Sequence, residues 1–255
     1  MIRAFIAGLA IAILAPFIGI FMVVKRYSLM ADTLSHISLV GIAAGILAGF
    51  NPIVGALVVA VAAAIGIDRL REAKQLFGES VLALFLSGSL ALATILLSIG
   101  GKYTANILSF LFGSITTVQN IDVIIIVSLS VVVLITLLFF YRQLFAVAFD
   151  EEMAEASGIR ARLFSAVLVV LAAVTVALSI RIVGALLVGA LMVVPVLSAI
   201  QFGRSFKRSI LLSILFSLVA VVVGLFLSFY IGLPTGGTIV IVALGIFMIS
   251  LAVGL

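Results

Sequence analysis

The sequence predicts an all-α, polytopic membrane protein with about nine transmembrane helices. Of its 255 residues, 66% are hydrophobic and only 9% are charged, and its mean hydropathy is +1.56. Soluble domains are roughly half apolar, whereas a transmembrane helix needs about 20 consecutive apolar residues. Runs of this kind fill almost the whole chain. We therefore expect residues 1–255 to form a single transmembrane domain with no soluble domain attached.

Nine apolar runs are long enough to suggest membrane crossings. The first has no small-residue cleavage pattern behind it, so we expect a first span and not a removed signal peptide. Residues 104–118 are apolar but short and interrupted by Gly113, which favours a re-entrant or surface segment on the outer side. The expected spans are residues 4–24, 31–48, 52–67, 80–99, 121–141, 163–180, 182–202, 209–230 and 237–255.

The basic residues predict how these spans are oriented. With Lys25 and Arg26 in the cytoplasm, nine spans put eleven of the fourteen basic residues on the cytoplasmic side, as the positive-inside rule requires. Only Arg3, Lys102 and Arg181 then face outward. A tenth span at 104–118 would remove this asymmetry, so nine spans are favoured over eight or ten. The N-terminus is expected outside and the C-terminus in the cytoplasm.

Composition also excludes several classes of site. The chain contains no cysteine, which rules out disulfide bonds and thiolate metal ligands. The sequence pI of about 10.0 does not imply a nucleic-acid partner, because the basic residues fall in short loops between spans. Residues Gly100-Gly101-Lys102-Tyr103 lack the spacing and the Ser or Thr of a P-loop, so we expect no ATPase activity in this chain.

Asp32 and His36, the only histidine, are the candidate metal ligands. Residues four apart share one helix face, about 6 Å apart along the axis. A carboxylate and an imidazole at this spacing can bind a divalent transition metal, although they can also form a buried polar pair. Ionisable groups within a membrane usually mark a transport path. Gly41, Gly45 and Gly49 lie on the opposite face and are expected to pack against a neighbouring helix.

A charged segment at about 142–162 is expected on the cytoplasmic side. Its central part, Asp150 to Gly158, begins with carboxylate residues and ends with a glycine. This order is typical of a short surface helix. Taken alone, this pattern also fits a solvated loop helix. Its candidate functional residues are Asp150, Glu151, Glu152, Ala154, Glu155 and Gly158.

Several motifs together resemble one family. They are Lys25-Arg26-Tyr27-Ser28-Leu29-Met30-Ala31-Asp32-Thr33-Leu34-Ser35-His36, Leu111-Phe112-Gly113, Asp150 to Gly158, Val183-Gly184-Ala185-Leu186-Leu187 with Pro195, and Leu233-Pro234-Thr235-Gly236 with Ile239-Val240. In this order they resemble the membrane permease of manganese, zinc and iron ABC importers, over almost the whole chain.

The resemblance implies a type II importer fold and a prokaryotic cell membrane. It implies a homodimer driven by two cytoplasmic ATPase subunits and supplied by an external metal-binding protein. The family's metal ligands correspond to Asp32 and His36, and its ATPase-coupling helix to Asp150 to Gly158. Two copies would contribute four oxygen and nitrogen ligands to a transported manganese or zinc ion, with no permanently bound cofactor.

Two other functions remain open at this point. An ion-coupled secondary transporter could use Asp32 and His36 as a proton or cation relay, but it would have no need of an ATPase-coupling helix. A siderophore or cobalamin permease would need a wide path without such ligands. Two weaker sites are Asp122, a possible acceptor of incoming metal, and the segment beginning at Pro234, which could shape an external gate.

Overall fold

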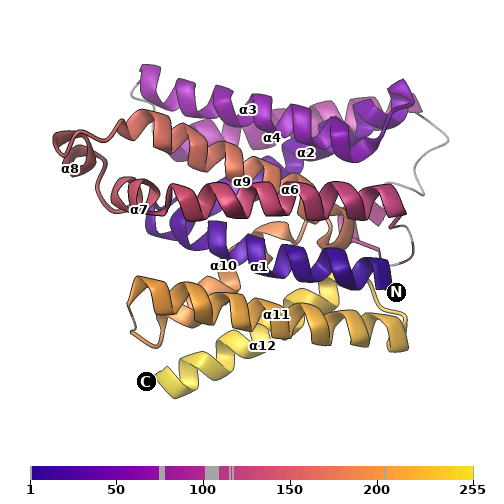
Figure 1. The fold of residues 1–255 in the computed structure, drawn as a ribbon. Helices are drawn as coiled ribbons and strands as arrows, with labels where there is room; N and C mark the ends of the chain where they lie inside the picture. Colours follow the sequence, from indigo (N-terminus) through magenta and orange to yellow (C-terminus); the bar gives the residue numbers. More distant parts are fainter. Residues whose placement is uncertain are drawn as a thin grey trace.

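A computed structural model describes residues 2–74, 78–100, 109–114, 116, 118–203 and 205–254. The side chains of residues 72–74, 78, 100 and 254 are outside this description. All regular secondary structure in the described part is helical (Figure 1). The helices are α1 (Ile2–Val24), α2 (Ser28–Ala48), α3 (Pro52–Lys74), α4 (Gly78–Gly100), α6 (Asn120–Phe139), α7 (Tyr141–Phe149), α8 (Glu151–Ala156), α9 (Ala161–Val183), α10 (Val188–Ile200), α11 (Phe206–Ile231) and α12 (Thr235–Gly254).

Three helices form the centre of the bundle. In the apolar windows of α1, α2 and α9, 72%, 67% and 67% of residues are buried, against 17% in α4. Helix α1 packs against α6, α9, α10 and α11, and α2 packs against α3, α4 and α9. The outer helices therefore present apolar side chains outward, which is the pattern expected when lipid and not water surrounds the protein.

Close backbone contacts between glycines fix the position of α2 against α3. A Cβ atom on Gly41 would lie 2.3 Å from the carbonyl oxygen of Gly55, and a Cβ on Gly55 would lie 2.3 Å from that of Gly41. Gly19 of α1 meets the backbone of Met192 in α10 in the same way, at 2.0 Å. Because any side chain would separate these helices, the missing Cβ atoms let the bundle close.

The expected glycine face of α2 is therefore confirmed for part of its length. Gly41 contacts α3, and a Cβ on Gly45 would lie 3.1 Å from Pro52. Gly49 was wrongly included, because it adopts a left-handed conformation (φ 75°) that ends the helix, and a Cβ there would have no neighbour within 4 Å.

The all-α membrane fold is confirmed, and the count of nine spans is approximate. In the described part of the chain, eight helices are long and apolar enough to cross a membrane: α1, α2, α3, α4, α6, α9, α11 and α12. The expected span at 182–202 is wrong in its bounds, because α9 continues to Val183 and α10 has only 13 residues. Such a helix is about 20 Å long, less than the roughly 30 Å of a bilayer core.

Backbone contacts explain the break between α9 and α10. The N–H groups of Ala185 and Leu186 donate to the carbonyl oxygens of Phe110 and Leu111, at 2.8 and 3.3 Å. These bonds hold residues 184–187 outside the helix and against the short helical segment at 109–112. The residues 101–108, 115 and 117 lie outside the described part, so the re-entrant course of 104–118 stays a prediction.

The two chain termini lie at opposite ends of the bundle (Figure 1). We call the end where α1 gives way to α2 the Lys25 end, and the end where α1 begins the Arg3 end. Helices α7 and α8 lie at the Lys25 end.

Replacing Gly41 with alanine is expected to destabilise the protein by about 1–3 kcal/mol, because the new methyl group must push the α3 backbone away. Gly88→Ala in α4 is the matched control, since a Cβ there meets no atom within 4 Å. Thermal unfolding of the purified protein in detergent measures both. Equal melting temperatures for the two variants would contradict the proposed importance of the α2–α3 contact.

Candidate functional site

Asp32 and His36 line the same cavity, close to the Lys25 end of α2. The cavity has a volume of about 330 Å³ and is bounded by α2, by α4 and by Leu186. Both side chains are half-buried. Glu79 in the first turn of α4 lines the same cavity. The helical spacing of Asp32 and His36 therefore brings the two groups to one open space, as the sequence predicts.

The carboxylate of Asp32 fits here because a side chain is missing on α10. A Cβ atom on Gly189 would lie 2.0 Å from Oδ1 of Asp32 and 2.8 Å from its Cγ. The Asp32 face of α2 thus meets α10, while the Gly41 face meets α3. The two faces are opposed, as expected from the helical wheel.

The imidazole of His36 has unused coordinating capacity. Its Nδ1 atom is buried and has no hydrogen-bond partner. A buried nitrogen without a partner is costly, and binding a metal would satisfy it. Among the described residues of one chain, no group of three or more His, Cys, Asp or Glu side chains could hold a metal ion. One chain thus offers two ligands of the four that a tetrahedral site would use.

The short surface helix expected at Asp150 to Gly158 is present as α8. The Asp150 side chain accepts a hydrogen bond from the N–H of Met153 at 2.9 Å and so caps the helix. Gly158 has φ 81°, and the N–H of Ile159 donates back to the carbonyl of Ala154, which closes the C-terminal end.

Helix α8 has an attached side and a free side. Ala154 is buried against Val147 and Ala161. Glu151 forms an ion pair with Lys25, with 2.5 Å between Oε1 and Nζ. Glu152, Met153 and Glu155 are exposed, Met153 by 70%. The segment is therefore held to the bundle on one side and leaves acidic and apolar side chains open on the other.

Asp122 has a structural role that the sequence did not reveal. Its carboxylate accepts a hydrogen bond from the Arg181 Nε at 3.0 Å and another from the backbone N–H of Gln119 at 2.9 Å. Both charged side chains of the ion pair are almost fully buried. The pairing ties the start of α6 to the end of α9, so this carboxylate is not available as an open metal acceptor.

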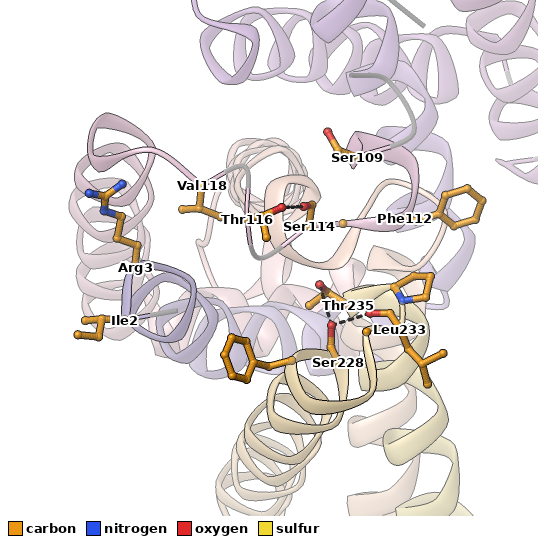
Figure 2. Close-up of a pocket in the computed structure, with 14 residues that line it drawn as sticks. Ile2, Arg3, Ser109, Phe112, Ser114, Thr116, Val118, Ser228, Leu233 and Thr235 are labelled. Atoms are coloured by element: carbon orange, nitrogen blue, oxygen red, sulfur yellow. Dashed lines mark hydrogen bonds between the residues drawn. The ribbon is translucent and has the colours of Figure 1, made fainter. Parts of the chain in front are cut away.

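A larger cavity of about 1070 Å³ opens at the Arg3 end (Figure 2). Ser228 donates to the carbonyl oxygen of Leu233 at 2.7 Å and lies 3.3 Å from the Thr235 hydroxyl. Gly236, in the first turn of α12, lies against the carbonyl of Val183. The segment from Pro234 thus borders a cavity at the opposite end of α1 from Asp32.

Three residues have roles in the structure that no sequence pattern indicates. Gly189 resembles any other membrane glycine, and Ser165 carries no signal. Lys25 belongs to the motif that ends at His36 and marks the topology, but nothing in the sequence indicates its partners. Each acts through a contact with a residue far away in the chain.

Comparison with known proteins gives consistent matches. Residues 1–254 match the ABC 3 transport family. The chain is 36% identical to a probable metal transport system membrane protein from Treponema pallidum, covering 99% of this chain and 94% of that protein. It is 29% identical to the manganese import system permease protein ScaB of Streptococcus gordonii, covering 97% and 89%. It is 28% identical to the high-affinity zinc uptake system membrane protein ZnuB of Haemophilus influenzae, covering 97% and 95%.

A solved structure also matches over most of its length. PsaBC from Streptococcus pneumoniae in complex with Fab superimposes with a TM-score of 0.87 at 30% identity, covering 97% of this chain and 89% of that one. The arrangement of helices described above is therefore one that a related protein adopts.

Gly189→Ala is expected to push the Asp32 carboxylate away from α10 and to weaken binding of Mn²⁺ or Zn²⁺ about tenfold, as changes behind a metal ligand commonly do. Titration of the purified protein with each metal measures the change. Gly237→Ala is the control, because a Cβ there has no neighbour within 4 Å. Unchanged affinity in Gly189→Ala, with normal thermal stability, would show that the carboxylate position does not matter.

Proposed function

The chain belongs to the ABC 3 transport family, and from this premise we propose that it is the permease of an ATP-driven importer for divalent transition metal ions. The observation that carries the proposal is the cavity shared by Asp32 and His36. Its lining combines a carboxylate with an imidazole that has a buried free nitrogen, and Gly189 on α10 leaves space for the carboxylate. Oxygen and nitrogen ligands together suit divalent transition metals.

The permease works as a dimer of identical chains in this proposal. A two-fold axis would bring two copies of Asp32 and two of His36 to one central path, giving four ligands. Among the described residues of one chain, no group of three or more His, Cys, Asp or Glu side chains could hold a metal ion, which supports this arrangement. A transport site must also release its ion, and ligands divided between two chains can be separated when the chains move.

Helix α8 is the proposed contact for a separate cytoplasmic ATPase subunit. Its exposed face carries Glu152, Met153 and Glu155, while Ala154 anchors it to the bundle. Asp150 and Gly158 fix its two ends. In this orientation the Lys25 end is cytoplasmic, and the cavity at the Arg3 end is open to an external metal-binding protein.

The transported ion is manganese or zinc, with ferrous iron as a third candidate. The names of two relatives refer to manganese import and to zinc uptake. A mixed set of carboxylate and imidazole ligands is compatible with each of these ions. An ion-coupled secondary transporter is less well supported, because it gives the exposed acidic face of α8 no role.

Asp32→Asn and His36→Ala are each expected to abolish most metal uptake, because the first removes the negative charge and the second removes the imidazole. Uptake of radioactive manganese, zinc and iron into vesicles containing the permease and its ATPase measures the loss. Thr33→Val is the control, since Thr33 lines the same cavity but donates its hydroxyl to the carbonyl of Leu29.

The yield of the dimer distinguishes between two explanations of a loss of metal uptake in these variants. Loss of uptake with a normal dimer supports direct ligation. Loss of both would favour a buried structural pair, and normal uptake in both variants would exclude Asp32 and His36 as ligands.

The orientation is testable because the chain contains no cysteine. Arg3 and Lys207 are exposed. Ser228 and Phe229, near the end of α11, line the same cavity as Arg3, so the start of α11 with Lys207 lies at the other end. In intact cells, an impermeant thiol reagent is expected to label Arg3→Cys and not Lys207→Cys. Labelling of Lys207→Cys alone would reverse the orientation and move α8 outside the cell.

A further inference from the structure

A group of polar side chains joins four separate parts of the chain at the Lys25 end. We call it the Lys25 cluster and define it as Lys25 and Tyr27 from the turn between α1 and α2, Arg71 from α3, Glu151 from α8, and Ser165 from α9. Lys25 donates a hydrogen bond to the Ser165 hydroxyl and forms the ion pair with Glu151. The Arg71 guanidinium lies over the Tyr27 ring, 3.9 Å from its centre.

Lys25 is unusual for a lysine at the end of a span. Its side chain is only 6% exposed, whereas the side chain of its partner Glu151 is 50% exposed. Lysines at such positions normally extend their charge into water. A buried ammonium group needs a partner, so the ion pair with Glu151 is expected to persist and to hold α8 in place.

The turn that carries Lys25 is short and tightly bonded. The N–H of Tyr27 donates to the carbonyl of Met22 at 2.7 Å, and the N–H of Met30 donates to the carbonyl of Tyr27 at 2.9 Å. Arg26 adopts a left-handed conformation with φ 60°. Helix α2 then starts at Ser28, one helical turn before Asp32. A movement of Lys25 therefore reaches Asp32 through a bonded turn and a continuous helix.

We propose that Lys25 is a positioning residue that transmits movement of α8 to the metal ligands on α2. The inference rests on the proposed function, because it assumes that an ATPase subunit acts on α8. When α8 moves, the Lys25–Glu151 ion pair moves the α1–α2 turn with it. The start of α2 shifts relative to α10, and the contact between Asp32 and Gly189 changes.

If Lys25 has this role, Glu151 and Glu155 on α8 have different functions. Glu151 faces the bundle and pairs with Lys25, whereas Glu155 is exposed on the free side of the helix. A lysine at position 151 would place a second positive charge beside the buried ammonium group of Lys25. Its effect on transport would therefore arise within the permease, even if the ATPase still binds.

The test uses the complete complex in vesicles and measures metal uptake and ATP hydrolysis together. Lys25→Met and Glu151→Gln each break the ion pair. Both are expected to lower the number of ions transported per ATP hydrolysed by roughly fivefold or more, the size of a typical coupling effect. The ATPase should still co-purify, because Glu152, Met153 and Glu155 on the free side of α8 are unchanged. The double variant Lys25→Glu with Glu151→Lys restores opposite charges and is expected to recover much of the coupling.

Lys207→Met is the matched control, since it removes an exposed lysine at the same end of the molecule. If wild-type and control complexes transport metal and Glu151→Gln retains normal uptake per ATP, the inference is overturned while the proposed function stands. If the wild-type complex transports no metal, the proposed function itself fails. Because Glu151 is half-exposed, Glu151→Gln gives a decisive result even if Lys25→Met does not fold.

Discussion

A charged side chain inside a lipid bilayer raises the free energy of folding unless another group compensates it, and this cost organises the described part of the protein. Arg181 and Asp122 neutralise each other where α6 meets α9. Lys25 is neutralised by an acidic residue of α8. Asp32 and His36 instead face a cavity, where ion and solvent can reach them. The charged side chains that hold helices together are thus paired within the chain, whereas the proposed metal ligands Asp32 and His36 face a cavity.

Much of this arrangement follows from the sequence alone. Long apolar runs predict the helices because few other structures satisfy the backbone in lipid. The spacing of Asp32 and His36 places both on one face of α2, and the structure brings them to one cavity. Asp150 and Gly158 predict the ends of α8 because capping depends on local backbone geometry. These features share one property, since each is determined by residues within a few turns of one another.

Features that depend on distant contacts could not be predicted in this way. The span expected at 182–202 becomes a break and a short helix because backbone groups near Phe110 take up the N–H groups that would have continued it. Gly189 gains its importance only from the position of Asp32 on another helix. The partner of Lys25 lies on α8, which no local pattern indicates. Burial and pairing of this kind are decided by tertiary packing.

The opposite placement of the two chain ends has a consequence for how such a permease can be encoded (Figure 1). The C-terminus of one copy lies at the Lys25 end, whereas the N-terminus of a second copy, in parallel orientation, would lie at the Arg3 end. A flexible linker cannot join them, because it would have to carry unsatisfied backbone groups through the lipid. A fused dimer would need an additional membrane helix. For the dimer proposed above, two separately synthesised copies of one chain avoid this requirement and keep both halves of the proposed metal path identical.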